Sequence, residues 1–255
     1  MTKLISSTLL VLSLSALLFA QQNPTSRNKN SKRYSNSLQA VVVTMPGWDD
    51  VHGTGQLFKR NTIYSKWRKV GEAFPVVVGR TGLAWGVGLH EVPTDLGGGA
   101  IKKEGDGKSP AGVFALSGAF GRRPKPRGTK LSFLRINTST ECVDDVTSRH
   151  YNSSLDRKSI ASADWNSSEK MFDITPEYDL GVFVDHNPTR TPSVGSCIFL
   201  HIWTDPGTPT AGCTSMSRKD VERILNFLDP RKRPVLIQMT EKEFGRFKMK
   251  FFPTS

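Results

Sequence analysis

The chain has few cysteines, one long apolar run and no internal repeat. Its three cysteines form no Cys-x-x-Cys pair and no cluster with His, so a structural zinc site is not expected. The apolar run, residues 4–20, is short and interrupted by serine, which excludes a multi-pass membrane protein. Hydrophobic residues make up 37% and charged residues 23% of the chain, a balance that excludes a disordered or collagen-like protein.

The first 20 residues have the pattern of a secretory signal peptide. Lys3 precedes the Leu-rich run, and the small side chain of Ala20 suits cleavage before Gln21. No cysteine lies near this point, which argues against a lipoprotein. We therefore expect residues 1–20 to be a signal peptide and the rest to be exported, with an uncleaved N-terminal anchor as the alternative.

The chain is strongly basic, with a formal net charge of +12 at pH 7. Residues 21–38 are polar, contain four cations and no acid, and are expected to form a disordered basic linker. A basic exported protein favours polyanionic surroundings such as anionic cell-wall polymers or lipid headgroups. No helix-turn-helix, zinc-finger or aromatic RNA-binding signature is present, so we do not expect nucleic acid as a partner.

From residue 39 the pattern is mostly that of short β-strands, which predicts a single β-rich domain over residues 39–255. The glycine-rich stretch 81–110 and the polar stretch 137–178 are expected to be loops, and a loop as long as 137–178 inside a compact domain is usually functional or stapled. The expected strands are 40–44, 56–60, 63–70, 75–79, 111–116, 180–185, 197–203 and 234–239.

One helix is clear. Ser217 and Asp220 resemble a capping box, and Asp229-Pro230 ends the pattern. Between this cap and this stop, apolar residues occur at helical spacing: Val221, Ile224, Leu225 and Leu228.

The tail, residues 241–255, is expected to pack on the domain surface, with membrane contact as the alternative.

Three cysteines in an exported chain cannot all be paired. Cys213 follows Gly212 in a turn shortly before the helix, where backbone N–H groups could bind an oxyanion and the helix N-terminus would lower the thiol pKa. Cys142 lies in an acidic loop and Cys197 begins an apolar strand. We expect these two to pair and to staple the polar loop to the strand that carries His201, with two unpaired buried thiols as the alternative.

His201 is the candidate base. Strand alternation places it on one face with Phe199 and Trp203. The chain then reaches Cys213 within twelve residues, so both side chains can lie at one site, where the imidazole could activate the thiol for acyl transfer. A structural role is the alternative for a lone His on a strand.

At this point the sequence resembles a known family. Residues 195–216 (GSCIFLHIWTDPGTPTAGCTSM) resemble the catalytic motif of the L,D-transpeptidase (YkuD-type) family, in which a His strand is followed by a loop and a Gly-Cys. Residues 104–114 resemble the second block of the family, a Thr/Ser-Pro-x-Gly-x-Phe strand, and the whole resemblance covers about residues 40–240. Ala211 stands where the family has a second His, and Ser215 where it has Asn or Arg, which is typical of a divergent branch.

The resemblance implies a mainly β, β-sandwich-like catalytic domain in the periplasm or cell wall that acts on peptidoglycan stem peptides. Cys213 would attack the carbonyl of the third stem residue and release D-Ala, with His201 as general base and an oxyanion turn that includes Gly212 and Thr214. An amine of a neighbouring stem would then form a 3-3 cross-link. The resemblance implies no metal and no cofactor. Independently of it, we expect no stable membrane insertion after signal cleavage.

Five residues are candidate substrate contacts: Ser215, His186, Trp203, Trp165 and Asn166. A turn-stabilising role is the alternative for His186. Trp165 and Asn166, together with Met171, would form a lid over the substrate, with loop packing as the alternative.

Two other functions stay open on the sequence. An L,D-carboxypeptidase would use the same Cys–His dyad with water as the acceptor. A non-catalytic, disulfide-stapled module would only bind the cell wall.

Overall fold

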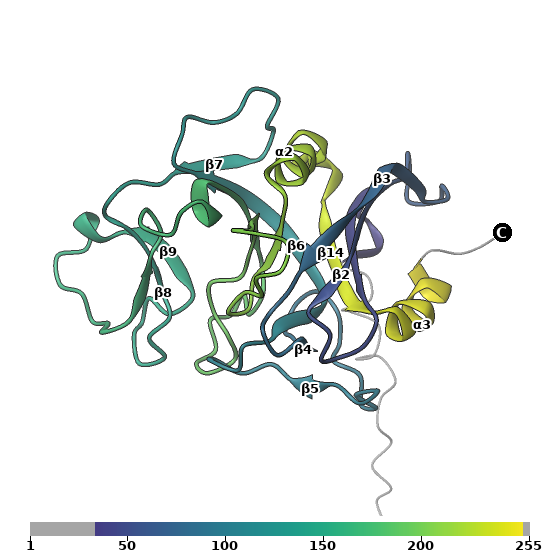
Figure 1. Ribbon diagram of the computed structural model, residues 1–255, viewed down its shortest axis with the longest axis horizontal. Coiled ribbons are helices and arrows are strands. Elements are labelled where there is room, and N and C mark those ends of the chain that lie inside the picture. Colours follow the sequence, from purple (N-terminus) through teal and green to yellow (C-terminus); the bar gives the residue numbers. More distant parts are fainter. Residues whose placement is uncertain (1–33, 252–255) are drawn as a thin grey trace, which may run out of the picture.

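The computed structural model describes residues 34–251 (Figure 1). Within them, eight strands close into a barrel-like ring, because β6 pairs with β14 through its first half and with β11 through its second half. A closed ring has no unpaired edge among its members. In ring order the strands are β11 (Leu180–Val184), β12 (Phe199–Ile202), β13 (Thr214–Met216), β3 (Arg68–Val77), β2 (His52–Lys59), β1 (Gln39–Met45), β14 (Val235–Thr240) and β6 (Ser109–Gly121).

Three further strands extend the ring. β4 (Leu83–Trp85) runs parallel to the start of β6 and pairs with β5 (Ala100–Ile101), and β7 (Ser132–Arg135) runs parallel to the end of β6. The expected strands 63–70 and 75–79 are one strand, β3, which begins only at Arg68. The glycine-rich stretch 81–110, expected to be loop throughout, contains β4 and β5.

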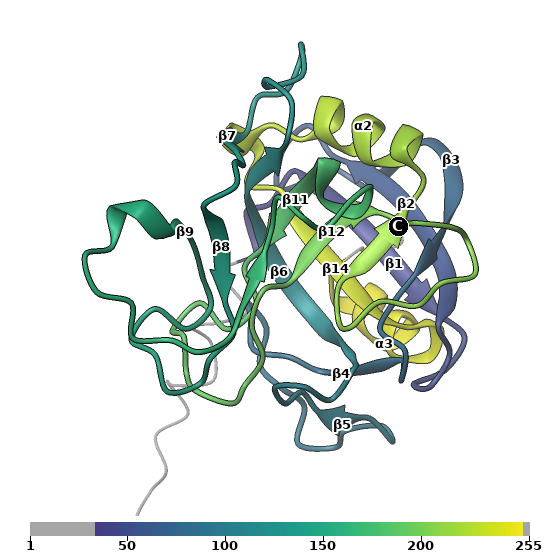
Figure 2. The same cartoon turned by 60° about the vertical axis from the view of Figure 1, so that its left-hand side comes forward.

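A small separate sheet lies to one side of the barrel in both views (Figures 1 and 2). Its strands are β8 (Thr140–Val143), β9 (Ser153–Asp156) and β10 (Ser168–Lys170). A short 3-10 turn follows β9 at Arg157–Ser159, and another follows β10 at Glu177–Asp179. The expected disulfide between Cys142 of β8 and Cys197, just before β12, is confirmed. It fastens the small sheet to the barrel and so to the strand that carries His201.

The predicted helix is α2 (Arg218–Phe227), and the mainly β fold with one prominent helix after Cys213 is confirmed. The Ser217 hydroxyl caps it by accepting the Asp220 N–H, and a 3-10 turn at Pro230–Lys232 follows it. Val221, Ile224, Leu225 and Leu228 join the main apolar core, which also contains the inward side chains of the barrel strands.

A second helix, α3 (Glu241–Phe251), was not predicted. Its Phe244 and Phe247 pack against a second apolar cluster formed by β1, β6 and β14, as expected for a tail on the domain surface. No helix in the described part of the chain is long and apolar enough to cross a membrane.

The expected signal peptide, residues 1–20, lies outside the described residues, as does most of the expected linker 21–38. The last residues of that linker make contacts with the domain. Ser37 is buried, and the Leu38 N–H donates to the Lys232 carbonyl.

Candidate active site

The parallel pairing of β12 with β13 brings the two candidate catalytic residues into one cavity. His201 lies opposite Ser215, so Cys213, directly before β13, lies beside Phe199, whose N–H donates to the Cys213 sulfur at 3.3 Å. Both Cys213 and His201 line a cavity of about 440 Å³. They are only 6% and 5% exposed, so the reacting atoms are largely shielded from bulk water. Cys213 is a free thiol, since the other two cysteines are bonded to each other.

The turn that carries Cys213 is fixed from the start of β6. The Ser109 hydroxyl donates to the Cys213 carbonyl at 2.7 Å and accepts the Gly79 N–H at 2.9 Å. The Thr210 hydroxyl donates to the same carbonyl and accepts the Gly212 N–H. Ser109 belongs to the second sequence block, where its contact with Cys213 could not be foreseen.

The expected lowering of the thiol pKa by the helix N-terminus is wrong. Burial, and then the negative charge of Glu169, raise the pKa of the Cys213 thiol; the Phe199 N–H opposes this shift only in part. The reason is geometric, because all of β13 separates Cys213 from α2 and the Ser217 side chain occupies the Asp220 N–H. The resting nucleophile is therefore a neutral thiol.

The imidazole of His201 is arranged to act as a base. Its Nδ1 lies 2.7 Å from the Ile202 carbonyl, which can only accept, so Nδ1 carries the hydrogen and Nε2 is left as the acceptor. Burial lowers the pKa of His201, although the Ile202 carbonyl and the charge of Glu177 oppose the shift. Thiol and imidazole are thus both neutral at rest, and proton transfer accompanies attack on a substrate rather than preceding it.

Tyr178 lies against both of these groups and was missed by the sequence analysis. Its ring centroid is 5.4 Å from that of His201, its hydroxyl donates to Glu169 Oε2 at 2.7 Å, and it lines the same cavity as Cys213. Tyr178 lies in the turn just before β11, in which Gly181 pairs with His201. Only that pairing, which local sequence does not reveal, identifies it as a site residue.

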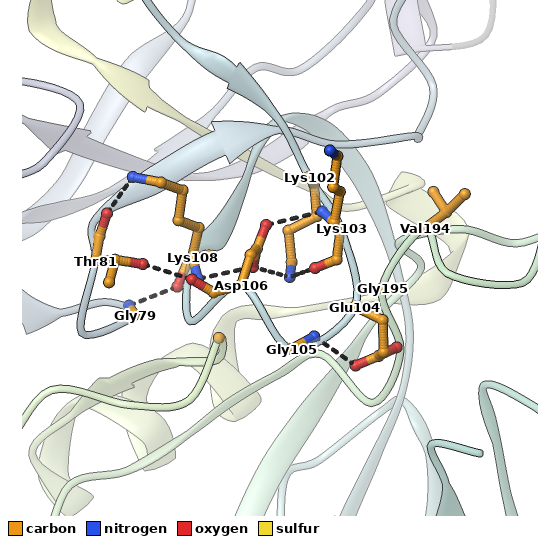
Figure 3. A network of polar contacts seen from close by, with 12 residues as sticks. Gly79, Thr81, Lys102, Lys103, Glu104, Gly105, Asp106, Lys108, Val194 and Gly195 are labelled. Atoms are coloured by element: carbon orange, nitrogen blue, oxygen red, sulfur yellow. Dashed lines mark hydrogen bonds and ion pairs between the residues drawn. The ribbon is translucent and has the colours of Figure 1, made fainter. Parts of the chain in front are cut away.

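Charged side chains surround the cavity, and the segment that supplies two of them is tightly held (Figure 3). Asp106 Oδ1 accepts from Lys102 Nζ at 2.5 Å and from the Lys108 N–H at 2.9 Å, and the other Asp106 oxygen accepts the Lys103 N–H. Glu104, in the middle of this loop, accepts from the Ser196 hydroxyl at 2.7 Å. The charged residues lining the cavity are Arg80, Lys102, Glu104, Asp144, Glu169 and Glu177.

Two of the expected substrate contacts, Trp203 and Ser215, line this cavity. Gly212 lines it as well, and so does Ala211, which replaces the second His of the family motif. Thr214 is buried, with its hydroxyl donating to Gln238 at 2.7 Å.

The structure does not bring His186, Trp165 or Asn166 to this cavity. His186 is buried between loops, accepts the Val87 N–H on Nδ1 and lines a different cavity. Trp165 donates its indole N–H to Glu141 and lines a third pocket together with Asn166. These contacts lie on the opposite face of β10 from Glu169, because side chains alternate along a strand. Met171, the third member of the expected lid, is fully buried in the core.

Within residues 34–251, no three His, Cys, Asp or Glu side chains are arranged to hold a metal ion.

The comparisons with known proteins agree with this geometry. A family model described as the L,D-transpeptidase catalytic domain (YkuD) matches residues 56–237. The matched range runs from β2 into β14 and contains Ser109, Tyr178, His201 and Cys213. The comparisons with curated proteins and with solved structures give no match.

Proposed function

Because the chain belongs to the L,D-transpeptidase catalytic domain family, whose members are peptidoglycan enzymes, we propose that it is an exported peptidoglycan L,D-transpeptidase. Cys213 is the proposed nucleophile and His201 the proposed general base. The observation that carries the proposal is a free thiol and an imidazole with an available Nε2 in one cavity, while the other two cysteines are sequestered in a disulfide.

In the proposed reaction the Cys213 sulfur attacks the carbonyl carbon of the third residue in a tetrapeptide stem, and its proton passes to Nε2 of His201. The tetrahedral oxyanion is stabilised by backbone N–H groups of the turn from Gly212 to Thr214. For Gly212 this requires release of its hydrogen bond to Thr210.

Collapse of the tetrahedral intermediate breaks the C–N bond. The imidazolium returns its proton to the amine of the departing D-Ala, which leaves a thioester on Cys213. An amine of a second stem then attacks the thioester and gives up its proton to His201. The products are a 3-3 cross-link and the regenerated thiol.

The dyad predicts a complete dependence of this activity on Cys213. Purified protein given disaccharide-tetrapeptides should release D-Ala and form 3-3 dimers, and Cys213→Ala should lower the rate by at least about a thousandfold. The matched control is Ser159→Ala, which removes an exposed hydroxyl and should keep full activity. Mass analysis of the muropeptides measures both products. Dimers formed by Cys213→Ala would refute the site.

The same assay separates the alternatives. An L,D-carboxypeptidase would give tripeptides and D-Ala without dimers, whereas a non-catalytic wall-binding module would give no product. Slow alkylation by iodoacetamide would not identify such a module, because burial by itself already raises the Cys213 thiol pKa. Acylation by a carbapenem, read as an intact-mass adduct that is absent from Cys213→Ser, tests the nucleophile without an acceptor.

A further inference from the structure

Tyr178 and Glu169 form a hydrogen-bonded pair against the nucleophile, outside the dyad. The Tyr178 side chain is only 4% exposed, and its ring packs edge-on against Phe199 at 5.4 Å and against His201 at the same distance. Phe199 in turn supplies the backbone N–H that binds the Cys213 sulfur. The phenol is therefore held in one position, with its hydroxyl donating to the Glu169 carboxyl in the cavity that Cys213 also lines.

Glu169 reaches this position because of the register of the small sheet. It lies opposite Cys142 in the β10–β8 pairing, so it projects from the same face as the disulfide and toward the barrel. Its sheet neighbours Ser168 and Lys170 contact Glu141 on the other face. The register thus directs a single carboxyl group of β10 at the nucleophile.

The surroundings of Glu169 disfavour its ionised form. Burial is the main cause, the nearby carboxylates of Asp144 and Glu104 add to it, and the pKa of Glu169 is raised to about 7 even though Tyr178 opposes the shift. Conversely, the negative charge of Glu169 raises the pKa of the Cys213 thiol, whereas Lys102 lowers it. Ionised Glu169 and a thiolate at Cys213 therefore disfavour each other.

We propose that Tyr178 is a positioning residue for the Cys213 thiolate and that the protonation state of Glu169 decides where the Tyr178 hydroxyl hydrogen points. An ionised Glu169 can only accept, so the hydroxyl donates to Oε2 and gives nothing to the sulfur. A protonated Glu169 donates its own hydrogen to the Tyr178 oxygen, and the hydroxyl is then free to donate to the sulfur as negative charge develops there. No bond other than hydrogen bonds changes in this step.

The inference rests on the proposed function, since it concerns how that nucleophile is activated. It predicts that the reaction requires one group in its deprotonated form and another in its protonated form. His201 must be neutral, which holds above its lowered pKa, and Glu169 must be protonated, which holds below about pH 7. Reactivity should therefore decline as the pH rises through about 7.

The test compares wild type with Glu169→Gln over the range from about pH 6 to pH 8.5. The rate of acylation by a carbapenem is measured by intact mass. Gln cannot ionise, and its amide can donate to the Tyr178 oxygen as a protonated Glu169 would. The ratio of the Glu169→Gln rate to the wild-type rate should be near one at pH 6 and rise to about tenfold at pH 8.5. The ratio cancels every other pH effect common to both proteins.

Two further variants complete the test. Tyr178→Phe should lower the rate about tenfold at pH 6 and should lose the dependence on Glu169. Glu222→Gln, on the exposed face of α2, is the matched control and should follow the wild type at every pH. A rate ratio for Glu169→Gln that stays flat across the pH range, or a Tyr178→Phe protein acylated at the wild-type rate, would overturn the proposal. If Tyr178→Phe does not fold, the Glu169→Gln ratio decides alone.

A second measurement keeps this inference separate from the proposed function. Alkylation of Cys213 by iodoacetamide needs no enzymatic activity and reports the thiolate directly. At pH 8 it should be about tenfold faster in Glu169→Gln than in either wild type or Tyr178→Phe, since neither of these offers a hydroxyl hydrogen to the sulfur at that pH. These differences without any carbapenem adduct would refute the proposed function and leave the proposed roles of Tyr178 and Glu169 intact. Equal alkylation rates in all three proteins would refute those roles.

Discussion

At the scale of single residues, Ser109 connects the two sequence blocks of the site. Its hydroxyl is fully buried and bridges the Gly79 N–H and the Cys213 carbonyl, so one oxygen satisfies two buried backbone groups. A buried backbone group left without a partner costs about 1–3 kcal/mol. Ser109 thus serves both the stability of the barrel and the position of the nucleophile.

Ser109→Ala should lower the free energy of unfolding by about 2 kcal/mol and also slow acylation of Cys213 about tenfold. The stability loss follows from the unpaired Gly79 N–H, and the rate loss from a turn that is no longer held in place. Urea unfolding and carbapenem labelling measure the two effects. Ser159→Ala, whose hydroxyl is exposed, is the control. A loss of stability without any loss of rate would show that Ser109 does not position the nucleophile.

At the scale of elements, the small sheet forms one wall of the cavity through Asp144 and Glu169, although among the described residues it has no strand pairing with the barrel. The covalent connection is the disulfide between Cys142 and Cys197, which closes a loop with a sequence separation of 55. Cys197 also accepts a hydrogen bond from the Cys213 thiol through its carbonyl. The disulfide therefore links the position of the wall to that of the nucleophile.

Replacing Cys142 and Cys197 together by Ala should destabilise the protein by about 4 kcal/mol, the chain-entropy estimate for a loop of this length. Carbapenem acylation should fall as well, because Glu169 and Tyr178 lose their fixed positions against Cys213. Wild type treated with a phosphine reductant should show the same losses, and the double variant should be insensitive to it. An unfolding midpoint in urea that is equal with and without the disulfide would contradict this prediction.

At the scale of the whole molecule, folding buries three histidines in neutral form. Burial lowers the pKa of His90 and of His186 to about 4, and it lowers that of His201 as well. As the pH falls below 6.5 the unfolded chain takes up protons on these groups and the folded chain does not. Their contribution to stability is therefore complete above about pH 6.5 and is lost toward pH 4. Glu169 has the opposite sign, because its raised pKa stabilises the folded protein at low pH and that stabilisation is lost as the pH rises through about 7.

The protein should consequently be less stable at pH 5 than at pH 8, and the difference should be largest in Glu169→Gln, where the opposing group is absent. His90 and His186 should each contribute a loss of about 2 kcal/mol at pH 5. Urea unfolding at the two pH values measures it. Equal unfolding free energies of Glu169→Gln at pH 5 and pH 8 would show that these histidines are not buried as neutral groups.

How far the sequence predicts this site depends on how local each contact is. The proximity of Cys213 and His201 was predictable because a short loop joins the strand of one to the turn of the other. Helix α2 was predictable because its cap, spacing and stop lie within one short segment. Tyr178, Glu169 and Ser109 were not, since each reaches Cys213 from a strand or turn distant in the chain.

The sequence alone determined the mainly β fold, the helix after Cys213 and the family, and it favoured the pairing of Cys142 with Cys197. The first three follow from alternation, spacing and motif, which are local in the chain, and the pairing was favoured because only Cys213 has the local context of a reactive thiol. Tertiary structure decided that β6 closes the ring, that Trp165 and Asn166 face away from the cavity and that Glu169 faces into it. It also decided that the thiol is neutral, because its pKa depends on burial and on charges that only long-range packing brings close to the sulfur.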